Sequence, residues 1–219
     1  MAKKQYAVLG LGIFGSTVAT TLAEQGCEVL AVDRDISCVE RVASEVTKAV
    51  VADVTKIEEL SALGIEDFDV AIIAIGTHLE EAVLATMHCK ELGVPYVITK
   101  AKNKAFMKIL ERVGADRVIR PEKEIGMKLA KSLLRKNLVD VVELDDDNSI
   151  VEIYAPTIWT GKTVKELNVR TKYEMNILGV RDKETEQLSL GVAPDYKVKP
   201  RDRFLVLART EKLEDFDTL

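Results

Sequence analysis

One short stretch near the N-terminus restricts the fold more than any other part of the chain. The apolar residues 6–9 are followed directly by a G-x-G-x-x-G pattern, formed by Gly10, Gly12 and Gly15. In a dinucleotide-binding turn the first glycine allows the sharp turn, the second lets backbone approach a pyrophosphate, and the third allows close helix–strand packing. A helix-like segment follows, and its N-terminus would face the anion. The pattern therefore predicts a nucleotide-binding turn.

The next apolar segment ends on an acidic residue. Residues 28–32 are expected to form a strand that leads into Asp33, at about the distance from the glycines where an acid binds ribose hydroxyls. A carboxylate repels a 2′-phosphate, so Asp33 argues against NADP, although the neighbouring Arg34 weakens that argument. The alternative is that the glycines serve turn geometry alone and that Asp33 is a capping or turn residue.

The composition excludes several classes of protein. The net charge of −5 argues against a nucleic-acid binder, which usually carries a basic surface. The first residues run directly into a predicted strand without a secretory apolar region. The longest apolar runs are far shorter than the roughly 20 residues of a membrane-spanning helix, so we expect a soluble protein. Three scattered cysteines without metal-ligand spacing suit a reducing cytosol.

The first part of the chain alternates between strand and helix patterns. Apolar, β-branched runs typical of strands buried on both faces occur at 5–10, 28–32, 48–52, 70–75, 96–99 and 117–119. Helix patterns occur at 16–24, 37–45, 57–63, 80–92, 104–113 and 122–136. Six such units predict an α/β fold with a Rossmann-like, doubly wound parallel sheet, whose ligand crevice lies at the carboxyl ends of the strands.

The alternation stops near residue 137, where we place a domain boundary. We expect a nucleotide-binding domain at 1–137 and a small α+β domain at 138–219. In the second domain the strand patterns are at 141–144, 150–154, 175–181, 187–191 and 203–208, with a short helix at 164–167.

Polar residues follow several of the predicted parallel strands, where loops of this fold contact ligands. Asp53, Thr77, Lys100 and Glu122 are the main candidates. Asp53 has an alternative role as a turn residue, and Glu122 as an acid that complements a helix dipole.

The helix predicted at 122–136 carries two apolar stripes rather than the single stripe that packing on one sheet requires. One stripe comprises Ile125, Leu129, Leu133 and Leu138, and the other Met127, Ala130, Leu134 and Val139. The second stripe indicates burial against another domain or subunit.

The residues favour binding over catalysis. The sequence has no G-x-S-x-G, no Cys–His pair and no H-E-x-x-H, and a Rossmann fold does not by itself imply an enzyme. Two other classes stay open. One is an NAD(H)-dependent oxidoreductase with a small regulatory domain, and the other is an NADH-responsive redox sensor, which is disfavoured because no helix-turn-helix is evident.

As a set, several motifs resemble the regulatory subunits of the Trk/Ktr potassium-uptake systems, whose domains are called RCK, for regulator of potassium conductance. The matching N-terminal stretches are YAVLGLGIFGS at 6–16, EVLAVD at 28–33, DVAIIAIG at 69–76 and GADRVIRPE at 114–122. The C-terminal stretches are VKELNVR at 164–170 and RDRFLVL at 201–207.

The resemblance implies a non-enzymatic gating subunit that binds an adenine nucleotide, ATP or ADP above all and NAD(H) as an alternative. The glycines would hold phosphates, Asp33 the ribose, and Asp53 with Val54 the adenine, while Glu122 would lie at the terminal phosphates, where some relatives bind Mg²⁺ or Ca²⁺. The rest of the site would comprise Ile13, Phe14, Arg34, Ile75, Gly76, Thr77, Lys100 and Ala101. The partner would be an integral-membrane potassium translocator, beneath which homodimers assemble into an octameric ring in the cytoplasm.

Two further points concern specificity. The Ktr branch often has arginine at the position of Ile13, where it reaches a neighbour's γ-phosphate; Arg120 or Arg34 is our hypothesis for its substitute. In some relatives the C-terminal domain binds cyclic di-AMP, and Arg170, Asn176, Ile177 and Pro194 stand near the positions concerned. Alone, these four are ordinary strand and loop residues.

Overall fold

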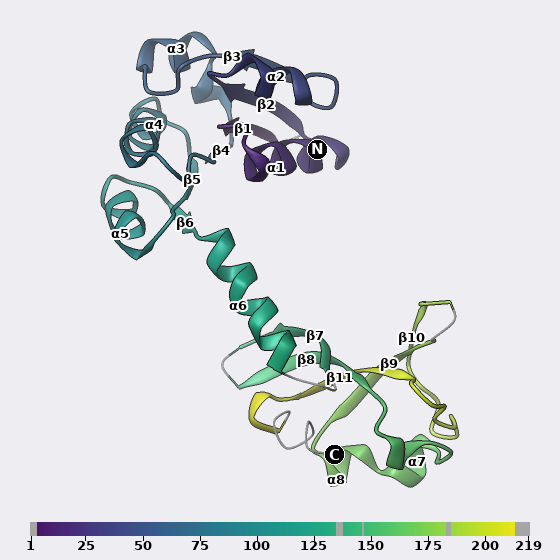
Figure 1. Cartoon of the computed structure of the whole chain (residues 1–219). Coiled ribbons are helices and arrows are strands. Elements are labelled where there is room, and N and C mark those ends of the chain that lie inside the picture. Colours follow the sequence, from purple (N-terminus) through teal and green to yellow (C-terminus); the bar gives the residue numbers. More distant parts are fainter. Residues whose placement is uncertain (1–3, 135–137, 146, 183–184, 213–219) are drawn as a thin grey trace. The chain divides into compact units, whose positions relative to one another are not determined.

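The computed structural model (Figure 1) describes residues 4–134, 138–145, 147–182 and 185–212. The chain divides into two compact units, residues 1–124 and 125–219, and each is described by itself. The boundary expected at 137/138 stays a prediction, because residues 135–137 lie outside the described ranges.

The first unit is built on a six-stranded parallel sheet, as the alternating pattern predicts. The strand order is β3-β2-β1-β4-β5-β6, so the order reverses direction between β1 and β4. The strands are β1 (Gln5–Leu9), β2 (Glu28–Asp33), β3 (Lys48–Val51), β4 (Val70–Ile73), β5 (Tyr96–Lys100) and β6 (Arg117–Ile119). The helices are α1 (Ile13–Glu24), α2 (Ile36–Val42), α3 (Ile57–Ala62), α4 (Leu79–Glu91) and α5 (Lys104–Arg112), with a 3₁₀ turn η1 (Ile65–Asp67). The helix α6 (Pro121–Leu134) begins in this unit and continues into the second.

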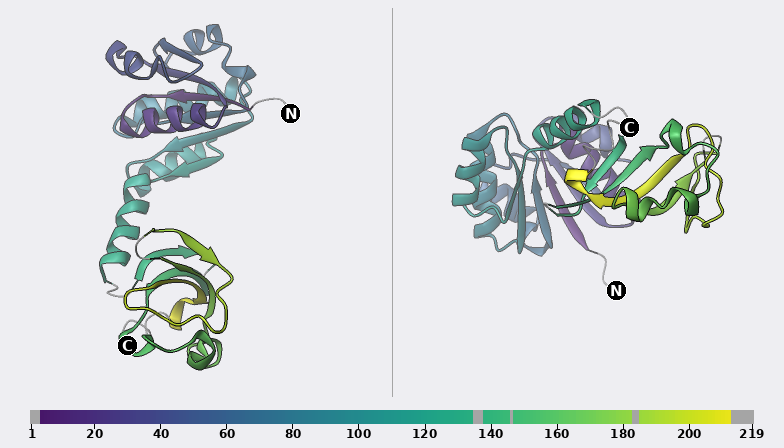
Figure 2. Two further views of the ribbon diagram at one scale, coloured as in Figure 1. Left: turned by 90° about the vertical axis from the view of Figure 1, so that its right-hand side faces the viewer. Right: turned by 90° about the horizontal axis from the view of Figure 1, so that it is seen from below.

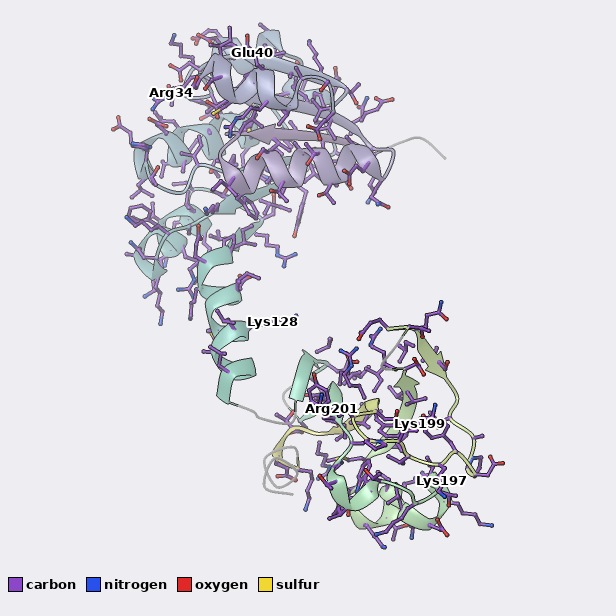
Figure 3. The ribbon with its side chains drawn as sticks, turned by 45° about the vertical axis from the view of Figure 1, so that its right-hand side comes forward. Arg34, Glu40, Lys128, Lys197, Lys199 and Arg201 are labelled. Atoms are coloured by element: carbon purple, nitrogen blue, oxygen red, sulfur yellow. The ribbon has the colours of Figure 1, made fainter. Side chains whose placement is uncertain are left out.

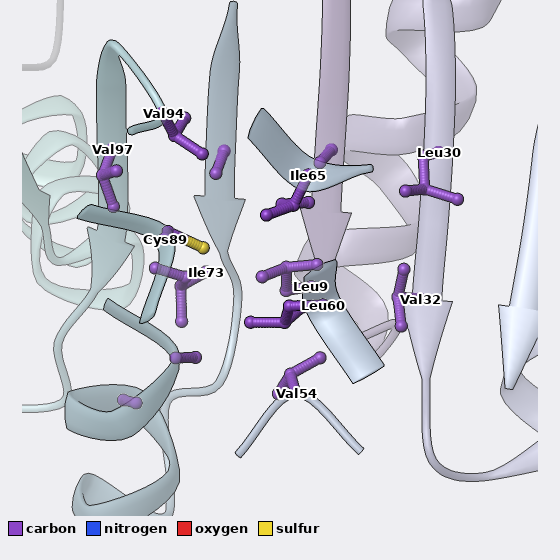
Figure 4. Packing of buried hydrophobic residues seen from close by; sticks show 14 of the residues in the cluster. Leu9, Leu30, Val32, Val54, Leu60, Ile65, Ile73, Cys89, Val94 and Val97 are labelled. Atoms are coloured by element: carbon purple, nitrogen blue, oxygen red, sulfur yellow. The ribbon is translucent and has the colours of Figure 1, made fainter. Parts of the chain in front are cut away.

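Helices cover both faces of this sheet (Figure 2). On one face Val8 and Ala31 pack with residues of α1 and α2. On the other face Leu9 and Ile73 pack with residues of α3, η1 and α4, as Figure 4 shows. Because successive side chains of a strand point to opposite faces, burial on both sides explains why these strands read as continuous apolar runs.

The bounds of α1 differ from the expected 16–24. The helix begins at Ile13, immediately after Gly12, whose extended backbone forms the N-cap. The sequence offers no Ser, Thr, Asp or Asn at this cap, which is the usual signal for a helix start. The glycine turn therefore joins the helix directly.

The second unit is built on a five-stranded antiparallel sheet in the order β10-β9-β11-β8-β7. Its strands are β7 (Leu138–Glu143), β8 (Asn148–Tyr154), β9 (Asn176–Arg181), β10 (Leu188–Leu190) and β11 (Arg203–Arg209). One face of the sheet, which includes the fully buried Phe204 of β11, packs on the fully buried Trp159. The short helices are η2 (Thr157–Trp159), α7 (Val164–Leu167) and α8 (Val169–Lys172). Within the described residues, no helix has the length and apolar character needed to cross a membrane.

Candidate functional site

The three glycines of the G-x-G-x-x-G pattern are held in three different environments. Gly10 has a φ of +95°, a backbone conformation that L side chains rarely adopt. At Gly15 a Cβ atom would lie 1.9 Å from the carbonyl oxygen of Gly10, so only glycine allows this approach of helix to strand. At Gly12 a Cβ atom would meet nothing within 4 Å. The open side of the turn therefore lies at Gly12.

The start of α1 has the character of an anion site. The first turn of this 12-residue helix contains no acidic residue, and its N-cap is a glycine without a side chain to satisfy the free backbone N–H groups. Those N–H groups and the helix dipole favour a negative charge. Ile13, the first residue of the helix, is 88% exposed. Its apolar side chain places no charge beside the helix N-terminus.

Asp33 reaches across from the end of β2 to the glycine turn. Its Oδ2 atom accepts a hydrogen bond of 2.6 Å from the backbone N–H of Leu11, and its Oδ1 atom accepts one of 2.9 Å from the N–H of Asp35. The half-buried carboxylate is thereby fixed beside the turn.

Arg34 pairs with Glu81, an acidic partner that the sequence does not suggest, and Thr77 lies beside His78 close to this pair. The Arg34 side chain projects at the surface of the first unit (Figure 3), with Nη1 2.9 Å from Oε1 of Glu81. Thr77 Oγ1 lies 3.0 Å from His78 Nδ1, and that nitrogen lies 4.0 Å from Oε2 of Glu81. Glu81, in the first turn of α4, therefore links the loops that follow β2 and β4. Arg34 and Glu81 are 47 residues apart in the chain, so no local sequence pattern indicates that they pair.

Asp53 organises the loop after β3. Its Oδ1 atom accepts hydrogen bonds from the N–H and hydroxyl of Thr55, and these bonds hold the pKa of Asp53 below its ordinary value. The N–H of Asp53 donates to Glu59, which also pairs with Lys56. The loop is thus stabilised by its own side chains, as the turn-residue alternative for Asp53 expects.

Lys100 brings together residues from four segments. Its Nζ atom lies 2.6 Å from Oε1 of Glu122 and 5.6 Å from the ring centroid of Phe14. Its methylene groups pack against Gly76, where an added Cβ would lie 3.0 Å from Lys100 Cε. The hydrogen bond from Lys100 is the largest cause that lowers the pKa of Glu122. The site therefore holds a nearly buried cation, with an exposed carboxylate as its counter-ion.

Two predicted site residues, Val54 and Ala101, have buried side chains that belong to the core of the first unit. Ile75 packs partly against the same core and closely on Gly10. At these positions the backbone is the group available to a ligand.

The family comparison agrees with this geometry. Residues 6–121 match the model of the TrkA-N domain, and residues 149–219 match that of the TrkA-C domain. The chain belongs to the Trk/Ktr family of potassium-uptake regulators. Ktr system potassium uptake protein A of Bacillus subtilis (strain 168) is 39% identical over 214 residues, which are 98% of this chain and 96% of that protein.

Solved structures show the same RCK fold. The crystal structure of the GsuK RCK domain has a TM-score of 0.67 at 16% identity, and the match covers all of this chain and 48% of that one. The structure of the GsuK channel bound to NAD has a TM-score of 0.65 at 15% identity, covering 97% and 38%. The Trk/Ktr chain thus spans about half of the GsuK RCK chain or less.

The residues considered for a second ligand lie in the second unit of this Trk/Ktr chain. Arg170 is on α8, and Asn176 and Ile177 begin the neighbouring β9. The carbonyl of Pro194 accepts a hydrogen bond of 2.8 Å from the N–H of Lys165 on α7. Arg170, Asn176 and Pro194 are exposed.

A metal site needs more ligands than the described part of the chain places together. No group of three or more His, Cys, Asp or Glu side chains suited to a metal ion occurs among the described residues. Glu122 is a single carboxylate, already paired with Lys100. By itself it does not form a site for a divalent cation.

Proposed function

We propose that this chain is a cytosolic regulatory subunit of a potassium-uptake system, which binds an adenine nucleotide and transmits its binding to a membrane translocator. The observation that carries the proposal is the bond from Leu11 to Asp33, which fixes a ribose-binding acid beside a glycine turn that is open at Gly12. Solved GsuK structures, which share the fold, are bound to NAD in one case and to ADP in another.

The residues fit such a ligand in distinct roles. The N–H groups at the start of α1 would bind phosphate oxygens, since Gly12 leaves the space for them. Asp33 would accept hydrogen bonds from ribose hydroxyls, and the backbone around Asp53 and Val54 would flank the base. Lys100 would supply a positive charge toward the phosphates, with Ile75, Gly76, Thr77 and Ala101 lining the remaining wall.

Membership of the Trk/Ktr family supports a membrane potassium translocator as the partner. The protein would lie at the inner face of the membrane through this partner. We further propose a homodimer, assembled into an octameric ring, that uses the apolar residues of α6. Ile125, Met127, Leu129 and Leu133 are all exposed within the described chain, and large exposed apolar surfaces mark interaction sites.

A regulatory switch of this kind works only if the nucleotide binds two shapes of the assembly with different affinities. Couplings of about 1–3 kcal/mol are typical. Mg²⁺ or Ca²⁺ would bind at Glu122 only together with nucleotide phosphates, because among the described residues Glu122 belongs to no group of three or more potential metal ligands. Cyclic di-AMP at Arg170, Asn176, Ile177 and Pro194 is a separate proposal, which an absence of binding to the purified protein would remove.

Calorimetric titration with ATP, ADP, NADH and NADPH, each with and without Mg²⁺, tests the proposed function. Tight binding of ATP and ADP, with a Mg²⁺-dependent preference for one of them, is the expected result. Binding of NADH alone would instead favour the redox sensor. Turnover with a hydride acceptor would favour the oxidoreductase.

A further inference from the structure

His88, near the end of α4, makes a contact that the sequence does not suggest. Its Nε2 atom lies 3.1 Å from the carbonyl oxygen of Thr55, 33 residues earlier in the chain. A carbonyl oxygen only accepts hydrogen bonds, so Nε2 carries the proton and donates. The His88 side chain is only 15% exposed, which shields this hydrogen bond from competing water.

The environment of the other ring nitrogen, Nδ1, indicates that the His88 side chain does more than fill space in the core. Nδ1 is buried and has no hydrogen-bond partner among the described residues. The carboxylate of Glu91, 3.6 Å away, lies beyond hydrogen-bond distance. Leaving a buried polar atom unsatisfied costs stability, and an apolar side chain would avoid that cost. The contact with Thr55 is therefore the feature that a histidine provides here.

Thr55 belongs to the loop that would flank the base of a nucleotide. Within this loop the Thr55 N–H and hydroxyl bind Asp53, while Val54 between them is buried in the core. These hydrogen bonds define the shape of the loop, and Val54 packs in the core cluster that includes residues of α4. His88 adds a polar contact from α4 to the backbone of the loop.

Helix α4 thereby connects two loops at the edge of the sheet. Glu81 in its first turn binds Arg34 after β2, and His88 two turns later binds Thr55 after β3. Because a helix is a rigid element, the two contacts fix the spacing between these loops. In the proposed function this is the spacing between the ribose end and the base end of the crevice.

We propose that His88 is a positioning residue, which holds the Asp53–Thr55 loop in place for the base of an adenine nucleotide. The inference rests on the proposed function for its ligand, while the loop contact itself does not. The experiment that tests this role compares two variants. In His88→Gln the amide nitrogen reaches the position of Nε2, whereas in His88→Leu the side chain fills the space without a hydrogen-bond donor. Glu91→Gln is the matched control, since it alters the neighbour of Nδ1 and leaves the donor to Thr55 intact.

Two readouts on the full-length protein test this role. In calorimetry with ADP, His88→Leu is expected to weaken affinity by about 2- to 10-fold, the effect of one hydrogen bond, while His88→Gln and Glu91→Gln stay close to the wild type. In hydrogen exchange without ligand, His88→Leu is expected to raise exchange at residues 53–56, and His88→Gln to restore protection. If His88→Leu does not fold, His88→Asn replaces it, because its shorter amide does not reach Thr55.

The outcomes separate the two proposals. Unchanged ADP affinity in His88→Leu, or equal losses in His88→Leu and His88→Gln, would overturn the positioning role. Failure of the wild type to bind any adenine nucleotide would overturn the proposed function and the ligand part of this inference. The exchange data would then still decide whether His88 positions the loop.

Discussion

Lys100 and Glu122 form a 2.6 Å ion pair between two groups of very different exposure, since 14% of the lysine side chain and 70% of the glutamate side chain is exposed. The pair joins the end of β5 to the first turn of α6. The carboxylate is therefore the member of the pair that solvent and competing groups reach, while the ammonium stays covered. A nucleotide phosphate could therefore take the place of Glu122 at Lys100.

This ion pair predicts opposite effects on ADP affinity when Glu122 and Lys100 are replaced. Without divalent cations, Glu122→Gln is expected to raise ADP affinity by roughly 3-fold, because a competing anion worth about 0.5 kcal/mol is removed. Lys100→Met is expected to lower affinity under all conditions. Calorimetry in a chelator decides this, and weaker ADP binding by Glu122→Gln would exclude competition for Lys100.

The ion pair also predicts a pH dependence. The pKa of Glu122 is lowered from its ordinary value of 4.5, chiefly by the hydrogen bond from Lys100. A lowered folded-state pKa means that the stabilisation is present above pH 4.5 and is lost as the pH falls through the folded pKa. In Lys100→Met the Glu122 carboxyl is expected to titrate close to 4.5. Carbon-detected NMR titration of both proteins measures this, and identical titration curves would contradict the pairing in solution.

Gly12 and Gly15 are expected to separate binding from folding. Gly15→Ala places a methyl group against the Gly10 carbonyl, and overpacking of this kind costs about 1–3 kcal/mol or more. In Gly12→Ala the added methyl group meets no protein atom within 4 Å. This variant is expected to unfold at a temperature close to that of the wild type. Its nucleotide affinity is expected to fall, because the methyl group occupies the open side of the turn. Thermal unfolding and ADP titration of both variants check this. Normal ADP binding by Gly12→Ala would show that phosphates do not approach there.

Arg120 is the candidate for discriminating ATP from ADP in the absence of arginine at position 13. Its N–H donates to Glu124 in the first turn of α6, which places the residue between β6 and that helix. Arg120→Ala is expected to weaken ATP binding at least about 10-fold more than ADP binding, the effect of one charge-assisted hydrogen bond. Arg34→Ala is the comparison, since Arg34 is already paired with Glu81. Equal weakening of ATP and ADP in Arg120→Ala would remove the hypothesis.

The apolar face of α6 predicts an assembly that a single charge disrupts. Leu133 is 76% exposed in the chain, and Leu133→Asp is expected to shift the protein toward monomers, because a charge buried in an apolar interface is costly. The exposed Lys123→Asp on the same helix is the matched control. Light scattering after size exclusion measures both. An unchanged mass for Leu133→Asp would place the interface elsewhere.

The parallel sheet and the glycine turn were predictable because the signal is local. Six apolar strands alternate with helix patterns, and the glycine turn lies within one segment of sequence. The partners of the site residues were not predictable, because Glu81 and His88 reach loops 47 and 33 residues away. The short helix α8 was missed for another reason. Asn168, in a left-handed conformation, separates it from α7, and four residues are too few to show a helical period.

The bond between Leu11 and Asp33 also has a consequence for rates. It is a hydrogen bond between two groups of the chain itself, so in the proposed function nucleotide association does not have to wait for this turn to become ordered. Stopped-flow mixing should then show a bimolecular phase whose rate rises linearly with nucleotide concentration. In the proposed function, a later, concentration-independent phase would report the change of shape of the regulatory assembly, and the delay before the translocator responds would be set by that phase rather than by nucleotide binding.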